Sequence, residues 1–345
     1  MGRLARLTEK SFVDQVARLT RPGRGGRGPA ARPVLGIGDD AAVLPTSRGL
    51  QTLLTTDFMI DGTHFRSAWT PGDLLGHKVL AVNLSDIAAM GGVPGAFVFS
   101  AGFPRSTDPG YALDVARGIA SQARRFGVVL VGGDTGASRA LLVSVTLLGH
   151  VEPGRAVRRS GARPGDGLYV TGSLGSSEAG LSLLKAGARL GRAAGARAAA
   201  MRAHLDPEPR VVAGRALGLS GLAAAMIDLS DGLAQDLPRL CAASGTGAVV
   251  EEAAIPVARP AAVVLGKRAA ARAALVGGED YELLFAARPA HDDNVRRLAR
   301  RLGLPVSRIG QIVPKRSGVL ILTRRGRYVP FEELPGGFRH FTADA

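Results

Sequence analysis

The sequence predicts a two-domain protein with an α+β arrangement in each domain. The 345 residues exceed the length that one hydrophobic core usually serves. A composition with 46% hydrophobic residues, 21% charged residues and 47 glycines is typical of an α/β or α+β protein. A turn-rich segment, EPGRAVRRSGARPGDG, separates the helix and strand patterns near residues 152–160, so we expect domains at 1–152 and 153–345.

In the N-terminal half, apolar runs and their breakers define the elements. The spacing of apolar residues predicts a helix that begins after Pro71 and ends at the pair Gly91 and Gly92. Two short apolar runs lead into acidic residues, which places Asp39 and Asp57 at strand ends. We expect helices at 8–20, 72–90 and 109–126, and strands at 34–37, 50–55, 96–102, 128–134 with a glycine turn, and 140–151.

In the C-terminal half, the same patterns recur around shorter elements. An Ala- and Arg-rich stretch at 186–200 has no clear periodicity. The run AAMIDLSDGLAQDL predicts the end of a strand that leads into a helix. We further expect strands at 167–173, 247–251 and 319–322, and helices at 176–187, 207–219, 259–272 and 292–301.

We single out ten carboxylates in six short motifs that contain glycine, serine or threonine. Acidic residues beside such small residues often mark turns or helix caps, but six motifs in a chain with a formal net charge of +15 indicate a shared site. Hard divalent cations prefer oxygen ligands, and Mg²⁺ is usually held by a few carboxylates and substrate phosphates. The motifs are GIGDD, TTDFMIDG, NLSD, GGDT, IDLSDG and GGEDYE, with Asp39, Asp40, Asp57, Asp61, Asp86, Asp134, Asp228, Asp231, Glu279 and Asp280.

The small residues in these motifs would let backbone N–H groups approach phosphate oxygens while the acids hold metal ions. The sequence contains no GxxxxGK[ST] motif and no kinase-type glycine loop with a paired catalytic lysine. We therefore expect nucleotide-dependent chemistry without either of these two common nucleotide folds.

Composition also argues against several classes of protein. No run reaches the roughly 18 apolar residues of a membrane span, and the N-terminus lacks the apolar core of a signal peptide. Cys241 is the only cysteine, which excludes an intramolecular disulfide and a cysteine-rich zinc site and agrees with a reducing compartment. We expect a cytoplasmic protein without a membrane partner.

The positive charge raises nucleic-acid binding as an alternative function. However, only 5 of the 44 basic residues are lysines, and the arginines are scattered in a way that is typical of a GC-rich coding sequence. The one local cluster, at 18–33, has no aromatic residue to stack on a base. We expect this cluster to be a flexible loop or arm and expect no nucleic-acid partner.

The order and spacing of the motifs resemble the thiamine-monophosphate kinase family, within the aminoimidazole ribonucleotide synthetase-like ATP-binding superfamily. The resemblance covers nearly the whole chain. It implies ATP as co-substrate, several Mg²⁺ ions, thiamine phosphate as the acceptor, and a homodimer in which the N-terminal sheets pair. The blocks are LGIGDDAAVL, TTDFMIDGTHF, KVLAVNLSDIAAMGGVP, GGDTGAS, GRAVRRSGARPGDGLYVTG, HLDPEPRV, IDLSDGLAQDL, GGEDYELLF and GGFRHF.

The resemblance also implies roles for single residues. Mg²⁺ ligands would be Asp40, Thr55, Thr56, Asp57, Asp86, Asp134, Asp228 and Asp231; ATP contacts would be Gly133, Asp134, Arg159 and Ser230; and thiamine phosphate contacts would be His64, Glu279 and Phe338. No general base is expected, because a phosphate monoester with a second pKa of about 6 is already anionic at pH 7. Which of Arg155, Arg158, Arg159 and Arg163 contacts phosphate stays open.

Other enzymes of the same superfamily remain alternatives. A selenophosphate synthetase would need a reactive cysteine or selenocysteine near its N-terminus, and the hydrogenase-maturation dehydratase needs a C-terminal cysteine. Cys241 lies in mid-chain and supports neither. An aminoimidazole ribonucleotide synthetase would use formylglycinamidine ribonucleotide instead of thiamine phosphate, so ATP consumption with each substrate distinguishes it from the kinase.

Overall fold

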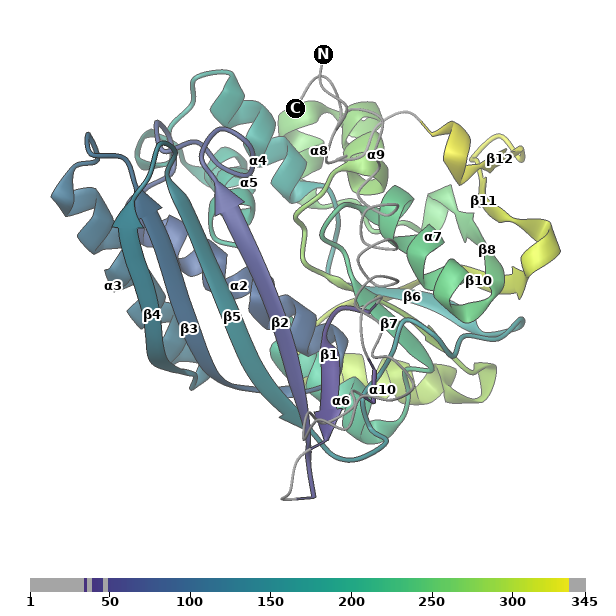
Figure 1. Cartoon of the computed structure of the whole chain (residues 1–345). Coiled ribbons are helices and arrows are strands. Elements are labelled where there is room, and N and C mark those ends of the chain that lie inside the picture. Colours follow the sequence, from purple (N-terminus) through teal and green to yellow (C-terminus); the bar gives the residue numbers. More distant parts are fainter. Residues whose placement is uncertain (1–33, 36–38, 46–48, 335–345) are drawn as a thin grey trace, which may run out of the picture.

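The computed structural model describes residues 34–35, 39–45 and 49–334. Two sheets and their helices form the two sides of the molecule in Figure 1. The first sheet has mixed strand directions because β3 and β4 pair in parallel while its other neighbours are antiparallel. Its spatial order is β1 (Ala42–Pro45), β2 (Gln51–Ile60), β5 (Leu142–Val151), β3 (Val93–Phe103) and β4 (Val129–Ala137).

Helices α2 (Gly72–Ala89) and α3 (Pro109–Phe126) cover one face of this sheet (Figure 1). They approach closely because glycines stand at the contact. A Cβ added at Gly76 would lie 2.2 Å from the carbonyl oxygen of Val115, and one at Gly118 would lie 2.0 Å from that of Asp73. The close approach leaves α2 buried along most of its length, so any polar side chain on α2 meets protein rather than water.

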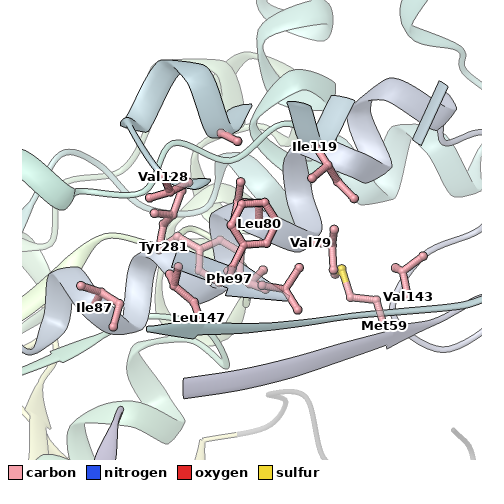
Figure 2. Packing of buried hydrophobic residues seen from close by; sticks show 14 of the residues in the cluster. Met59, Val79, Leu80, Ile87, Phe97, Ile119, Val128, Val143, Leu147 and Tyr281 are labelled. Carbon is pink, nitrogen blue, oxygen red and sulfur yellow. The ribbon is translucent and has the colours of Figure 1, made fainter. Parts of the chain in front are cut away.

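The core between α2, α3 and the sheet is apolar and includes one residue from the second half of the chain. Leu53, Val79 and Leu147 are fully buried there. Tyr281 belongs to the same cluster, and Figure 2 shows it among the labelled residues of this core. This contact holds the GGEDYE motif against the N-terminal layer.

The second sheet has seven strands among the described residues. Its spatial order is β12 (Tyr328–Pro330), β11 (Val319–Leu322), β8 (Thr246–Glu251), β10 (Val306–Pro314), β6 (Gly167–Thr171), β9 (Leu283–Ala287) and β7 (Ala225–Asp228). The α-helices of this half are α4 (Ser176–Lys185), α5 (Gly195–Leu205), α6 (Val211–Ser220), α7 (Leu233–Ser244), α8 (Arg259–Leu265), α9 (Lys267–Val276) and α10 (Asp292–Leu302). Short 3₁₀ turns are η2 (Leu190–Arg192), η3 (Glu252–Ala254), η4 (Pro289–His291), η5 (Lys315–Ser317) and η6 (Phe331–Glu333).

The arrangement confirms the predicted α+β class and most of the predicted helices. Two predictions about strands were wrong. Asp57 lies inside β2 rather than at its end, because β2 pairs with β5 as far as Ile60. Gly132 and Gly133 continue β4 instead of turning, because both pair with β3. Strands β1, β9, β10 and β12 were not predicted.

Two further differences concern helices. The helix expected at 259–272 is divided into α8 and α9 at Gly266, which has a φ of +78°. The stretch 186–200 without clear periodicity contains the start of α5. The helix expected at 8–20 lies outside the described residues. Within the part of the chain that the structure describes, none of the helices combines the length and apolar character needed to cross a lipid bilayer.

Candidate metal and phosphate site

Three carboxylates from separate elements converge at the junction of the two halves. Asp40 precedes β1, Asp86 lies in α2, and Asp228 ends β7. One oxygen from each lies within 4.8 Å of the other two. Asp40 and Asp228 are buried and Asp86 is nearly so. Residues that are far apart in the sequence thus form one compact acidic cluster, which we call the acidic triad.

Burial makes the charge of this cluster costly. It raises the pKa of Asp86 and of Asp228 well above the ordinary value, and neighbouring carboxylates raise both further. Burial also raises the pKa of Asp57, and the carboxylates of Asp231 and Asp40 raise it further. Like charges that are close and desolvated favour protonation or a bound cation. The cluster is therefore built to accept positive charge.

Hydroxyl groups orient two of the triad carboxylates. Thr55 donates its hydroxyl hydrogen to Asp86. Ser85 donates to Oδ2 of Asp228 at 2.7 Å. Each carboxylate thereby keeps a defined direction while its other oxygen remains available for a ligand.

Arg159 supplies the positive charge next to the triad. Its Nε and Nη2 donate to the two oxygens of Asp40 at 3.0 and 2.8 Å. Its backbone N–H faces the carboxylate of Asp39 at 3.1 Å, and burial raises the pKa of Asp39 to about 6. Among the four arginines that the sequence left open, the structure places Arg159 against the acidic cluster.

The loop after β7 carries Ser230 and Asp231 and is tied to the GGEDYE motif. Glu279 donates its backbone N–H to the carbonyl oxygen of Ser230 at 2.7 Å, and Tyr281 donates to that of Leu229 at 2.9 Å. These bonds run between backbone atoms, so the two loops hold one another near the triad.

The side chain of Asp231 is fixed from α7. Arg239 pairs with Asp231 at 2.6 Å and with Asp236 at 2.8 Å. The backbone N–H of Asp231 donates to Oδ2 of Asp236 at 3.0 Å. Sequence reasoning missed Asp236 and Arg239, although their spacing on one helix after the LSD motif was visible.

Other predicted residues lie elsewhere within this chain. Asp57 faces α2, because β2 alternates between buried and exposed positions. Thr56 is on the opposite, exposed face, where its hydroxyl contacts that of Thr146 at 2.8 Å. The pairing registers of β2, β5, β3 and β4 put Asp134 in the row of Phe58, on the exposed face. Gly133 shares the row of Asp57 but is three strand spacings away, about 14 Å.

The predicted substrate residues also have defined positions. His64 follows β2, accepts a hydrogen bond at Nδ1 from the backbone of Ile60 at 3.1 Å, and meets Phe58 edge to face. Glu279 forms an ion pair with Lys78 and contacts Nδ1 of His204. Asp280 accepts the backbone N–H of Gly175 at 2.6 Å and so caps the start of α4. Phe338 lies outside the described residues.

The residues at the triad fit a hard divalent cation. All donors are carboxylate or hydroxyl oxygens, which Mg²⁺ prefers over nitrogen or sulfur. Opposite ligands of one Mg²⁺ are about 4 Å apart, close to the 4.8 Å within which the three triad oxygens lie. The raised pKa values of Asp86 and Asp228 indicate a need for cationic charge beyond Arg159.

Comparison with known proteins identifies the family. Residues 38–151 match the N-terminal domain model of AIR synthase related proteins, and residues 163–323 match the C-terminal domain model. The thiamine-monophosphate kinase of Salmonella typhimurium is 37% identical over 306 residues, which cover 89% of this chain and 91% of the relative. That of Bacillus subtilis is 33% identical and covers 89% and 93%.

Solved structures agree with this result. A structure described as AaThiL complexed with AMPPCP and TMP has a TM-score of 0.82, 29% identity and 99% coverage of both chains. The thiamine-monophosphate kinase of Stenotrophomonas maltophilia has a TM-score of 0.76 and 34% identity, and covers 92% of this chain and 96% of that one. HypE of E. coli, at a TM-score of 0.66 and 19% identity over 82% and 86%, shares the fold alone. This chain therefore belongs to the thiamine-monophosphate kinase family.

Proposed function

We propose that this chain transfers the γ-phosphoryl group of ATP to thiamine phosphate and forms thiamine diphosphate and ADP. Relatives that align with 89% of the chain at 33% and 37% identity are thiamine-monophosphate kinases. The AaThiL structure, with its ATP analogue and TMP, supports the same pair of substrates. The observation that carries the proposal is the convergence of Asp40, Asp86 and Asp228.

The proposed cofactor is Mg²⁺, held by the acidic triad together with Asp57 and Thr55. Bound Mg²⁺ would neutralise phosphate charge and orient the transferred group. The chain's own residues prepare this site, because Ser85 and Thr55 orient the carboxylates. Arg159, now paired with Asp40, carries a permanent positive charge that can interact with a nucleotide phosphate.

Transfer is proposed to be direct, without a phosphoenzyme. The acceptor phosphate is already ionised at pH 7, so the residues need only orient two polyanions and exclude water. His64 is the one predicted site residue whose nitrogen could carry a phosphoryl group. With ATP made chiral at the γ-phosphorus, inversion of configuration supports direct transfer, whereas retention would contradict it. A His64→Asn variant with intact kcat and raised KM would support a binding role.

The acceptor is tested by ADP release with three candidate substrates. Thiamine phosphate should sustain rapid ADP release, whereas thiamine and formylglycinamidine ribonucleotide should not exceed the acceptor-free rate. Preference for the ribonucleotide would instead favour the aminoimidazole ribonucleotide synthetase function. Addition of DNA at physiological salt should form no tight complex, because the arginines are scattered.

We propose that the active form is a homodimer that pairs the exposed faces of two N-terminal sheets. Large apolar side chains are exposed on this face of the sheet, among them Phe58 at 54%, Val129 at 60% and Val98 at 37%. Such a patch is typical of an interface between proteins. Asp134 shares this exposed face, so a second copy could receive Asp134 at its own metal site.

Subunit mixing tests this arrangement. Asp57→Asn and Asp134→Asn homodimers should each be inactive. When they are mixed and exchange subunits, hybrid dimers contain one site with both aspartates, so activity should recover to roughly a quarter of wild type. If Asp134 acts within its own chain, the mixture stays inactive. A monomeric mass by light scattering at micromolar concentration would contradict the dimer itself.

We propose that the protein works in the cytoplasm. We also propose that residues 1–152 and 153–345 form its two domains. The buried thiol of Cys241 suits a reducing compartment. In this division the first domain supplies Asp40, Asp57 and Asp86, and the second supplies Asp228 and Glu279.

A further inference from the structure

The segment 204–210, from the HLDPEPRV block, connects the GGEDYE loop to the N-terminal helices. Every second residue of the segment is ionisable and pairs with a side chain outside it: two pair with the GGEDYE motif, one with α2 and one with α3. The pairs are His204 with Glu279 at 3.1 Å, Asp206 with His77 of α2 at 3.0 Å, Glu208 with Arg125 of α3 at 2.6 Å, and Arg210 with Glu282 at 2.5 Å. This segment, which we call the strap, thereby fixes the loop that carries Glu279.

The carboxylate of Glu279 is held on two sides. Nζ of Lys78, on α2, lies 2.9 Å from Oε1, and Nδ1 of His204, at the end of α5, lies 3.1 Å from Oε2. The Lys78 side chain is 1% exposed and that of His204 is 4% exposed, whereas that of Glu279 is 25% exposed. The two partners are thus enclosed in protein, and Glu279 alone presents a surface to a ligand.

The charges of this group fit together. Burial alone would raise the pKa of Glu279, but Lys78 and His204 lower it to about 2. Burial lowers the pKa of His204 and Lys78 lowers it further, while Glu279 raises it; the net downward shift favours the neutral imidazole. A carboxylate only accepts hydrogen bonds, so this contact requires the proton on Nδ1 of His204. The Oγ of Ser177, 3.1 Å from the same nitrogen, adds a second polar contact there.

The backbone of Glu279 is constrained as well. Its φ of +63° and that of Tyr281, +49°, lie in the left-handed region, which is costly for residues other than glycine. Neighbouring structure holds this conformation through the bond from Glu279 to Ser230 and the buried ring of Tyr281. Side chain and backbone therefore fix the direction of the same carboxylate.

We propose that Lys78 and His204 are positioning residues that hold Glu279 as an oriented anion for the phosphoryl acceptor. The inference rests on the proposed function and on the role that the family resemblance implies for Glu279, a contact to thiamine phosphate. Because Lys78 balances the charge of Glu279, the exposed oxygen surface acts as a directed hydrogen-bond acceptor rather than as a net negative charge. A buried charge without its partner would be strongly unfavourable, so both members of the pair are needed.

Kinetics of four variants test the positioning role. Lys78→Met and His204→Leu should raise the KM for thiamine phosphate by about 10- to 100-fold, the cost of a lost charged hydrogen bond, while the KM for ATP stays within about twofold. His204→Asn retains an N–H donor near Nδ1 and should recover most of the affinity. Glu208→Gln is the matched control from the same strap, because its ion pair is exposed, and it should behave as wild type.

A different result would overturn the proposal. If folded Lys78→Met and His204→Leu proteins keep the wild-type KM for thiamine phosphate, neither residue positions Glu279. If the KM for ATP rose as much as the KM for thiamine phosphate, the substitutions would have disrupted the fold in general, and the proposal would likewise fail.

Thermal denaturation provides a readout that does not depend on the substrate. Lys78→Met should lower the Tm of the wild type, because it leaves the charge of Glu279 without its partner. In a Glu279→Gln background the same substitution should leave the Tm unchanged or raise it, because it removes a buried lysine that has lost its charged partner. Equal Tm losses in both backgrounds would contradict the pairing. If the wild type fails to phosphorylate thiamine phosphate while this coupling is present, the proposed function fails and the pairing stands.

Discussion

The substitution Asp228→Asn should have opposite effects on stability without and with Mg²⁺. Without the ion, Asp228 is one of three carboxylates whose oxygens lie within 4.8 Å, and burial and Asp40 raise its pKa. Asparagine has the same shape and removes the charge, and its Oδ1 can still accept the hydroxyl of Ser85. The variant should therefore be more stable than wild type when the ion is absent.

The size of this effect follows from the geometry of the triad. Two unit charges no more than 4.8 Å apart repel by at least about 3.5 kcal/mol at an effective dielectric constant of 20. Arg159 offsets part of the charge on Asp40, and the upward pKa shifts of Asp86 and Asp228 favour protonation, which reduces the repulsion further. A gain of about 1–3 kcal/mol remains, or about 1–4 °C in Tm for a chain of this size.

Mg²⁺ should reverse the order of stabilities. At 100 times its dissociation constant, an ion that binds only the folded protein stabilises by about 2.7 kcal/mol. Wild type should gain this stabilisation and Asp228→Asn should not. The assay is calorimetry of EDTA-treated protein with and without added Mg²⁺, with turnover measured in parallel. A variant that is less stable than wild type in EDTA, yet retains the Mg²⁺ shift, would refute the reasoning.

Three further predictions use other parts of the structure. Burial raises the pKa of Asp236 and of Asp280 to about 7, above an unfolded value of about 3.9. Their contribution to stability is present at low pH and lost as pH rises through 7, so the Tm in EDTA should be lower at pH 8 than at pH 5.5. A higher Tm at pH 8 would contradict this assignment. Gly76→Ala should lower the free energy of unfolding in denaturant by about 3 kcal/mol or more, because its Cβ would lie 2.2 Å from a backbone oxygen. Gly191→Ala, whose Cβ would have nothing within 4 Å, should leave the free energy of unfolding unchanged. Equal losses of stability in the two variants would contradict this prediction. Burial raises the pKa of Cys241 to about 12, so a thiol reagent should label it only on unfolding, and rapid labelling of the folded protein would contradict its burial.

The acidic motifs could be predicted to share a site because their residue types have a common chemistry. Hard-cation ligands in six motifs indicated a metal site before any element was placed, and the structure brings Asp40, Asp86 and Asp228 together. The face on which each acid lies could not be predicted. Asp57 and Asp134 looked equivalent in sequence, but the strand registers put them on opposite faces of one sheet.

The support around Glu279 was also missed, for a physical reason. A single lysine in an amphipathic helix pattern is normally solvent-exposed, so Lys78 gave no signal. Its burial follows from the packing of α2 against both halves of the molecule, which is a tertiary effect. The alternation of ionisable residues from His204 to Arg210 was visible in the sequence, but their partners are in elements far along the chain.

The most direct test of the account is ³¹P NMR of the purified protein with ATP, thiamine phosphate and Mg²⁺. We predict that the resonance of thiamine phosphate is replaced by the two coupled resonances of thiamine diphosphate, in step with the formation of ADP. The same sample with EDTA, or with the Asp86→Asn variant, should show no conversion. ATP hydrolysis to inorganic phosphate without thiamine diphosphate, or unchanged conversion by Asp86→Asn, would contradict the claim that the acidic triad supports phosphoryl transfer to thiamine phosphate.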